Sequence, residues 1–224
     1  MDVPLSLQNI EIGDKIVTLF VPDSHAVQAA YNHQKKTDLK APFPYWAKIW
    51  PSAKALAEYL VKRPGLYLGK SVMELAAGLG LPSLAIAPLA KKVICSDYQE
   101  QAVDAIAKSA RQNRYNNLEP ALMDWNDIPE TATCDLLLLS DINYDPLAFE
   151  QLERLIICFI KKGSTILLAT PQRLMAKPFI AAITGFISGQ EDITVSDPDG
   201  QTTISILVLN DATTHIAAAP LQFR

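Results

Sequence analysis

The sequence predicts an α/β fold in which helices cover both faces of a mostly parallel sheet. Short apolar segments alternate with helical segments between residues 71 and 187, which is the order of repeated strand–helix–strand units. The segment CDLLLLS at 134–140 is apolar on both faces, as in a strand covered on two sides. With 224 residues, 49% of them hydrophobic, the chain can bury one core. We therefore expect a single domain over 1–224, divided into an N-terminal extension (1–49), a core (50–210) and a C-terminal tail (211–224).

Ahead of the core, residues 8–21 alternate weakly around the turn dipeptide Gly13-Asp14 and predict a small β-hairpin. A short helix is expected over 25–36. After the break at Ala41-Pro42-Phe43-Pro44, a further helix begins at Pro51 and ends before Pro64-Gly65.

The core itself alternates between predicted strands and predicted helices. The strands are SVMEL (71–75), KVICSD (92–97), PALMD (120–124), CDLLLLSD (134–141) and STILLAT (164–170). The helices lie at 82–90, 101–115, 147–160 and 173–187. Two further strand-like runs about Asp197-Pro198-Asp199-Gly200 predict an antiparallel hairpin that finishes the sheet.

Composition indicates which kinds of partner and which cellular compartment to expect. A formal net charge of −4 supplies no general attraction to a polyanion, so we expect no nucleic-acid partner. Cys95, Cys134 and Cys158 lie in apolar runs without a CxxC pair, which predicts buried free thiols and a reducing, cytoplasmic setting. No apolar run approaches the ~20 residues of a membrane span, and no export signal is visible. We expect a monomer that neither crosses nor binds a membrane.

Polar residues follow the ends of four successive strands. The first strand leads into Glu74-Leu75-Ala76-Ala77-Gly78-Leu79-Gly80, and the second ends at Asp97. The third ends at Asp124-Trp125, and the fourth at Ser140-Asp141-Ile142-Asn143-Tyr144. Because ligands of open parallel sheets bind beyond the carboxyl ends of the strands, these residues suit one nucleoside site.

Each position also has a structural interpretation. Asp97 suits the cap of a helix that begins near Gln99, and Asp124 and Trp125 suit a loop and a core residue. Asp141 suits a turn or a helix cap ahead of Pro146. The ligand interpretation is favoured because the structural ones would have to coincide at consecutive strand ends.

The glycine loop favours S-adenosylmethionine over a dinucleotide. A pyrophosphate loop needs a third glycine, and Ser83 stands in its place. A carboxylate such as Glu74 would repel phosphate but would suit a ligand that carries an ammonium and a sulfonium charge.

These motifs resemble those of the seven-strand protein lysine methyltransferases. The upstream run Pro44-Tyr45-Trp46-Ala47-Lys48-Ile49-Trp50-Pro51 is similar to the branch that includes the electron-transfer-flavoprotein β-subunit lysine methyltransferases and their bacterial relatives. The resemblance covers about residues 44–144. It implies a Rossmann-like class I methyltransferase fold and transfer of a methyl group from S-adenosylmethionine to a protein lysine.

The resemblance also implies roles for individual residues. The cofactor-binding set is Trp50, Glu74, Ala76, Gly78, Gly80, Asp97, Tyr98, Asp124, Trp125 and Ser140. Glu74, Gly78 and Gly80 would line the methionine end, Asp97 the ribose, and Asp124 and Trp125 the adenine. Asp141 and Tyr144 would face the acceptor as catalytic residues. Apart from the resemblance, the rings of Tyr144, Tyr45 and Trp46 suit either walls of an acceptor channel or ordinary packing.

Two departures from the family pattern are visible. Ala76 stands where the family usually has glycine, which is tolerable if its backbone keeps a negative φ. Ile142-Asn143 replaces a small apolar pair, which leaves the acceptor open.

Other functions stay open at this stage. The same cofactor half can serve a small-molecule N- or O-methyltransferase, or a binding protein without catalysis. An open entrance between residues 1–50 and the 190–201 hairpin would favour a protein acceptor. Lys35, Lys36, Lys40 and Lys48 suit either an acidic protein partner or plain solvation. His25, His33 and His215 lack metal-ligand spacing, so no metal is expected.

Overall fold

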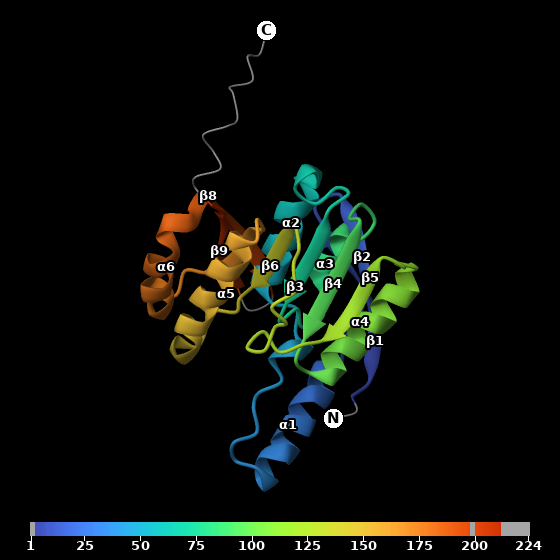
Figure 1. The fold of residues 1–224 in the computed structure, drawn as a ribbon. Helices are drawn as coiled ribbons and strands as arrows, with labels where there is room; N and C mark the ends of the chain where they lie inside the picture. The colour runs from blue at the N-terminus through green and yellow to red at the C-terminus, as the bar shows by residue number, and fades with distance from the viewer. Residues whose placement is uncertain (1–2, 198–199, 212–224) are drawn as a thin grey trace.

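The computed structural model describes residues 3–197 and 200–211, and this part of the chain has the expected α/β architecture (Figure 1). A seven-stranded sheet has the order β5-β4-β3-β6-β7-β9-β8. Neighbours among β3 to β7 pair in parallel, and β9 pairs antiparallel with both β7 and β8. The strands are β3 (Ser71–Leu75), β4 (Lys92–Asp97), β5 (Leu118–Leu122), β6 (Leu136–Ser140), β7 (Thr165–Pro171), β8 (Ile187–Asp197) and β9 (Gly200–Leu209).

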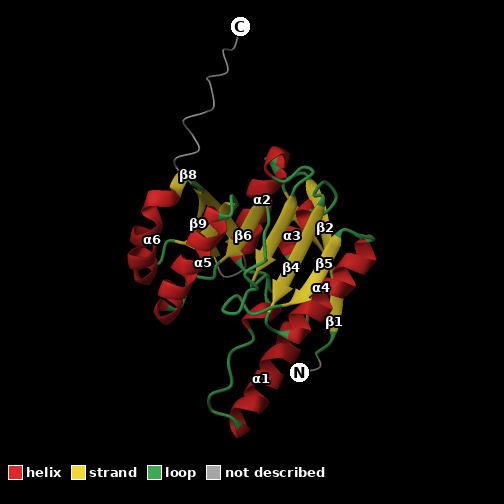
Figure 2. Cartoon of the chain, viewed as in Figure 1, coloured by secondary structure: helices red, strands yellow, loops and turns green. Residues whose placement is uncertain are grey.

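Helices cover both faces of this sheet, as Figure 2 shows. The α-helices of the core are α2 (Pro51–Val61), α3 (Leu81–Ile86), α4 (Glu100–Asn113), α5 (Phe149–Lys161) and α6 (Lys177–Ile183). Short 3₁₀ turns are η1 (Tyr45–Ala47), η2 (Pro64–Leu66), η3 (Pro146–Ala148), η4 (Leu174–Ala176) and η5 (Thr184–Phe186). In β6, Leu136 and Leu138 join the core under α2, α3 and α4, while Leu137 and Leu139 join the core under α5 and α6. The prediction that this strand is apolar on both faces is confirmed.

The N-terminal extension consists of a β-hairpin and a helix. β1 (Leu5–Ile12) and β2 (Lys15–Pro22) pair antiparallel around Gly13-Asp14, as predicted. The hairpin docks on α4, where the Phe20 backbone N–H donates to Ser109 Oγ at 2.9 Å. α1 (Ser24–Thr37) begins at Asp23, whose side chain accepts from the Ala26 N–H at 2.7 Å. Figure 1 shows α1 projecting from the end of the molecule towards which the β4 and β5 arrows point.

Three predictions about elements need correction. The strand expected at 120–124 lies two residues earlier, so Asp124 follows β5 within a loop. The helix expected over 173–187 is interrupted, because two 3₁₀ turns flank a short α6 whose first turn contains proline. Cys95 and Cys134 are buried free thiols as expected, but Cys158 is exposed because it lies on the outer face of α5.

Pro198 and Asp199 of the predicted hairpin turn lie outside the described residues, although β8 and β9 themselves form the expected antiparallel pair. Most of the predicted tail, from residue 212 onward, also lies outside them. In the described residues, no helix has the length and hydrophobicity needed to cross a bilayer.

Candidate active site

The loop after β3 is built on three residues with a left-handed backbone. Ala76, Gly78 and Gly80 have φ values of 50°, 56° and 70°. A Cβ on Gly80 would lie 2.7 Å from Cys95 Sγ, and one on Gly78 would lie 3.3 Å from the Trp46 carbonyl oxygen. Glycine is favoured at both positions, because a side chain would strain the backbone at either one, would collide at Gly80 and would make a tight contact at Gly78.

The expectation that Ala76 keeps a negative φ is wrong. Its φ of 50° lies in the left-handed region that favours glycine. The Ala77 N–H that follows donates to the Ser96 carbonyl at 2.9 Å, which ties the chain to β4 just where Ala76 turns. The tight turn between β3 and the glycines therefore outweighs the preference of alanine.

Glu74 lies behind the loop rather than on a solvent-facing surface. It is fully buried, and its Oε2 accepts from the Ser83 backbone N–H at 2.9 Å and from Ser83 Oγ at 2.5 Å. Its Oε1 has no partner within the described residues. Burial raises the pKa of Glu74 to about 7, against the opposing hydrogen bonds from Ser83. Ser83, which replaces the third glycine of a dinucleotide loop, thus joins α3 to β3.

Asp97 closes the same loop from the end of β4. Its Oδ2 accepts from the Gly78 N–H at 2.9 Å, and its Oδ1 accepts from the Gln99 N–H at 3.0 Å. The N-cap of α4 is Gln99, so Asp97 does not occupy the cap position that was its structural alternative. Burial raises the pKa of Asp97, while backbone hydrogen bonds to Gln99 and Gly78 lower it.

Asp124 and Trp125 lie in the loop after β5. Asp124 Oδ1 accepts from the backbone N–H and from Nδ2 of Asn126, both at 2.8 Å, which is a loop-forming role. Trp125 is half-buried against the core under α5. Both residues also line a cavity, so the loop role of Asp124 and the packing of Trp125 are compatible with the predicted ligand contacts.

Asp141 forms a two-point ion pair with Arg173. Arg173 Nη2 donates to Oδ2 at 3.1 Å, and Nη1 donates to Oδ1 at shorter range. Asp141 has a φ of 56°, and its backbone N–H donates to the Ala169 carbonyl at 2.9 Å. Burial raises the pKa of Asp141, whereas Arg173 lowers it. The cap ahead of Pro146 is Asp145, not Asp141, because Asp145 accepts from the Leu147 N–H.

Arg173 was not found by the sequence analysis. It follows β7 at Pro171-Gln172-Arg173, so the signal was available in the same rule that selected the other strand ends. The preceding residues were assigned to an apolar strand, and Arg173 was assigned to the start of a helix.

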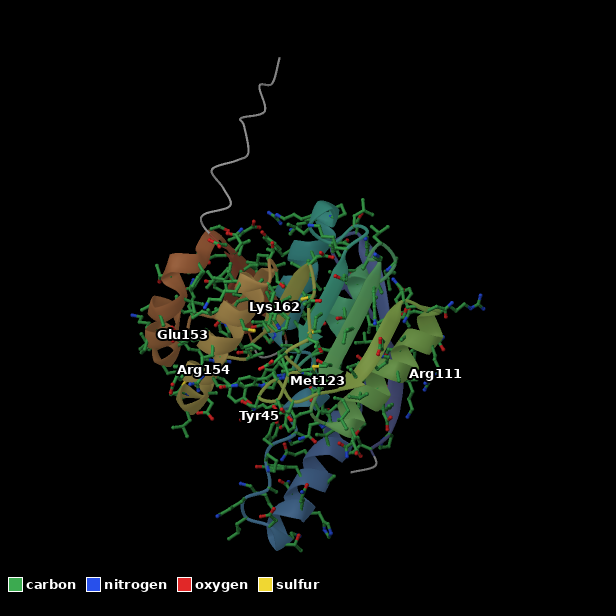
Figure 3. All side chains as sticks on the ribbon, in the orientation of Figure 1. Tyr45, Arg111, Met123, Glu153, Arg154 and Lys162 are labelled. Atoms are coloured by element: carbon green, nitrogen blue, oxygen red, sulfur yellow. The ribbon has the colours of Figure 1, made fainter. Side chains whose placement is uncertain are left out.

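Aromatic residues form the near wall of the site. The Tyr45 ring centroid lies 5.5 Å from that of Tyr144 and 5.9 Å from that of Trp50. Trp50 Nε1 donates to the Tyr45 carbonyl at 2.7 Å, which fixes the indole just ahead of α2. Lys48 Nζ lies 5.2 Å from the Trp50 ring centroid, within the range of a cation–π contact. Tyr45 is marked in Figure 3.

One cavity of about 550 Å³ brings these residues together at the carboxyl ends of the parallel strands. Its volume lies in the range of about 300–1,000 Å³ usual for small-ligand sites. The predicted residues that line it are Trp50, Ala76, Gly78, Gly80, Asp97, Tyr98, Asp124, Trp125, Ser140, Asp141 and Tyr144. Glu74 is absent from this lining and supports the loop from behind.

The entrance differs from the expected one. The N-terminal extension contributes Tyr45, Trp46, Lys48 and Ile49 to the lining, but among the described residues none of β8 or β9 lines the cavity. The segment around η3 and Arg173 stand there instead. The reason is topological, since the 190–201 hairpin lies at the far edge of the sheet from β3 and β4.

The charge of the lining favours a cationic ligand. The carboxylates of the lining outnumber its Lys and Arg side chains: Asp97, Asp124, Asp141 and Asp145 against Lys48 and Arg173. Such a surface attracts a sulfonium or ammonium group and disfavours a pyrophosphate. Within the described residues, no group of three His, Cys, Asp or Glu side chains is placed to hold a metal ion.

Comparison with known proteins gives consistent matches. A family model described as lysine methyltransferase matches residues 45–186. The electron transfer flavoprotein beta subunit lysine methyltransferase of Danio rerio is 33% identical over 134 residues, which cover 59% of this chain and 52% of that protein. The histone-arginine methyltransferase METTL23 of Mus musculus is 26% identical over 188 residues, covering 75% of this chain and 74% of that protein.

Solved structures share the fold. The N-methyltransferase NodS of Bradyrhizobium japonicum in complex with S-adenosyl-L-homocysteine matches with a TM-score of 0.56 and 15% identity, covering 79% of this chain and 97% of that one. The expected class I methyltransferase fold is thereby confirmed. The chain spans about half the length of the electron transfer flavoprotein beta subunit lysine methyltransferases that it matches.

Ala76→Gly should stabilise the protein by about 0.5–1 kcal/mol, because glycine adopts a positive φ without steric cost. The matched control is Ala77→Gly, whose backbone has no positive φ and which should lose a similar amount. Urea denaturation of the three proteins measures both changes. A loss of stability in Ala76→Gly would contradict the assigned strain.

Glu74→Gln should gain stability relative to the wild type as pH rises. The folded-state pKa of Glu74, about 7, lies above the ordinary glutamate pKa of 4.5, so the wild type loses stability as pH rises from 4.5 to 7, and the loss stays constant at higher pH. At about 1.4 kcal/mol per pH unit, the difference is on the order of 3 kcal/mol. Denaturation of both proteins at pH 5 and pH 8 measures it, and an equal difference at the two pH values would exclude a raised pKa.

Proposed function

We propose that this chain, which belongs to the lysine methyltransferase family, is an S-adenosylmethionine-dependent methyltransferase that modifies a lysine side chain of a protein. The observation that carries the proposal is the single cavity at the strand ends, where the glycine loop and Asp97 meet the Asp141–Arg173 pair and Tyr144. Cofactor and acceptor groups thus share one enclosed space.

The residues present fit S-adenosylmethionine. Gly78 and Gly80 bring the backbone close to the cavity, and Asp97 keeps carboxylate lone pairs beyond those used by Gly78 and Gln99. Trp125 and Asp124 offer an aromatic surface and an acceptor for adenine. Glu74 acts indirectly in this proposal, by holding the loop through Ser83.

The bound cofactor supplies an electrophilic methyl group: the acceptor nitrogen forms a bond to that carbon while the carbon–sulfur bond breaks, leaving S-adenosylhomocysteine. Orientation accounts for most of the acceleration in such a displacement. Tyr144 and Tyr45 would hold the aliphatic part of the acceptor, and Asp141 would accept a hydrogen bond from its nitrogen.

Arg173 resolves a difficulty with an acidic residue at this position. A lone carboxylate raises the pKa of a nearby ammonium and so opposes formation of the neutral amine that reacts. The two-point contact with Arg173 compensates the charge of Asp141 and fixes the orientation of its carboxylate. Asp141 can then orient the amine with less effect on its pKa.

A second candidate acceptor is a protein arginine. The histone-arginine methyltransferase relative aligns over three quarters of this chain. Asp141 also binds a guanidinium in the structure, that of Arg173, so its carboxylate has the geometry for such a group. A small-molecule acceptor would need only the cavity, without the exposed side chains around it.

The remaining proposals concern the setting of the enzyme. We propose a cytoplasmic monomer without a nucleic-acid partner: the net charge of −4 argues against a polyanionic partner, and the free thiols of Cys95 and Cys134 favour a reducing compartment.

Calorimetric titration with S-adenosylhomocysteine, S-adenosylmethionine and NAD tests the cofactor. Binding of the first two without NAD supports the proposal, and binding of NAD alone would overturn it. Mass spectrometry of candidate acceptors, beginning with the electron transfer flavoprotein β subunit and a histone, then separates lysine from arginine modification.

Asp141→Ala should lower kcat at least about 100-fold, because the acceptor nitrogen loses its oriented partner. S-adenosylhomocysteine affinity should stay within about threefold, since the cofactor half of the cavity is unchanged. Single-turnover kinetics and calorimetry measure the two effects. Unchanged turnover would remove Asp141 from the mechanism.

Arg173→Ala should move the acidic limb of the kcat–pH profile upward by about one pH unit, because the uncompensated Asp141 raises the pKa of the bound amine. Arg173→Lys should restore part of the profile. The control is Arg154→Ala, which breaks a surface pair with Glu150 on α5, where Figure 3 marks Arg154. A uniform fall in kcat at every pH would indicate only structural support.

A further inference from the structure

Exposed apolar side chains lie among or directly beside the residues that line the cavity. Tyr45 and Tyr144 line it while about half exposed. Leu147 is 93% exposed and stands between the lining residues Asp145 and Ala148, and Leu174 and Met175 directly follow Arg173. We define the mouth rim as Tyr45, Tyr144, Leu147, Leu174 and Met175.

The mouth rim suits contact with another macromolecule. Exposed apolar side chains gathered beside a cavity typically mark a protein interface, whereas single exposed leucines need no explanation. A small acceptor that enters the cavity would leave Leu147 and Leu174 in water.

The second part of the surface is basic. Lys35 and Lys36 lie in the last turn of α1, and Lys40 follows the helix. All three side chains are exposed. In residues 3–197 and 200–211, no carboxylate forms an ion pair with any of them. Asp38 lies between them, but its side chain accepts from the Lys40 backbone N–H at 2.9 Å. We call Lys35, Lys36 and Lys40 the basic arm; it is positive in a chain whose net charge is −4.

Aromatic rings in edge-on and tilted contact connect the basic arm to the mouth rim. Tyr31 of α1 lies 5.2 Å from Phe43, Phe43 lies 5.1 Å from Tyr45, and Tyr45 lies 5.5 Å from Tyr144, measured between ring centroids. Lys35 Nζ lies 5.5 Å from the Tyr31 ring centroid. In α1 only Val27 is buried, so the helix has little packing against the core. The ring contacts therefore do much to hold α1 in place relative to the acceptor side of the cavity.

We propose that the mouth rim and the basic arm form one docking surface for a protein that presents its acceptor side chain beside an apolar residue and carries an acidic segment further along. The contacts of 5.5, 5.2 and 5.1 Å that lead from Lys35 through Tyr31 and Phe43 to Tyr45 set that separation. The proposal rests on the proposed function, because the rim matters only if the acceptor enters there. RNA fits less well, because three lysines neutralise few phosphates and the rim is apolar.

Two labelled peptides test the surface by fluorescence anisotropy, with S-adenosylhomocysteine present. Both carry Leu-Lys-Leu and a flexible spacer of about eight residues, which reaches about 25 Å when extended. One then ends in a run of glutamates and the other in glutamines. The glutamate peptide should bind about tenfold tighter at low salt, and the difference should vanish at high salt.

Charge reversal identifies the basic arm. The triple variant K35E/K36E/K40E should abolish the preference for glutamate, while K91E/K108E/K161E, which makes the same charge change at exposed sites elsewhere, should keep it. Loss of the preference in both variants, or no preference in the wild type, would overturn the proposal. So would tight binding of a transfer RNA that the first variant alone abolishes.

Substitution in the mouth rim should weaken both peptides equally. The variant L147S/L174S tests this, and L68S/L89S, at exposed leucines that precede β3 and β4 at the opposite ends of these strands, is its control. Unchanged peptide binding in L147S/L174S would contradict the rim. Because these measurements need no turnover, a chain that binds the acidic peptide as expected but methylates no protein would contradict the proposed function and leave the docking surface standing.

Discussion

The site depends on where the strand order of the sheet reverses. β4 and β5 extend the sheet on one side of β3, and β6 and β7 extend it on the other, so two crossover connections leave β3 and β6 in opposite directions. The gap between those connections becomes the cavity. Hydrogen bonds hold the short loops at that gap, among them those from Ser83 to Glu74 and from Gly78 to Asp97.

Two buried carboxylates hold this arrangement in place. Glu74 and Asp97 both lie inside the protein, and each accepts hydrogen bonds from the loop that it supports. A bare buried carboxylate is costly, and the hydrogen bonds only partly offset the cost. The strain at Ala76 and Asp141 lies in the same region. The segments that line the candidate site therefore carry buried charge and backbone strain, both unfavourable for stability, as in other functional sites.

Much of the fold was predictable because its signals are local. Alternation of apolar strands and helices, the Gly13-Asp14 turn and the glycines at 78 and 80 each report a backbone requirement within a few residues. The candidate lining followed from the strand-end rule. The positive φ of Ala76, the ion pair of Arg173 and the buried position of Glu74 depend on contacts between distant segments, which periodicity does not contain. The prediction that Cys158 is buried was wrong for a simpler reason. An apolar run on a helix still has residues on its outer face, and Cys158 is one of them.

The position of β9 has a consequence for how the chain is made. β9 is the last strand of the sheet in the sequence, yet it lies inside the sheet, between β7 and β8. During synthesis, β7 therefore keeps an unpaired edge until residues 200–209 leave the ribosome. The nascent chain must keep this apolar edge unpaired until the β8–β9 pair is inserted beside it, so the chaperone dependence and aggregation of this protein should depend on β8 and β9.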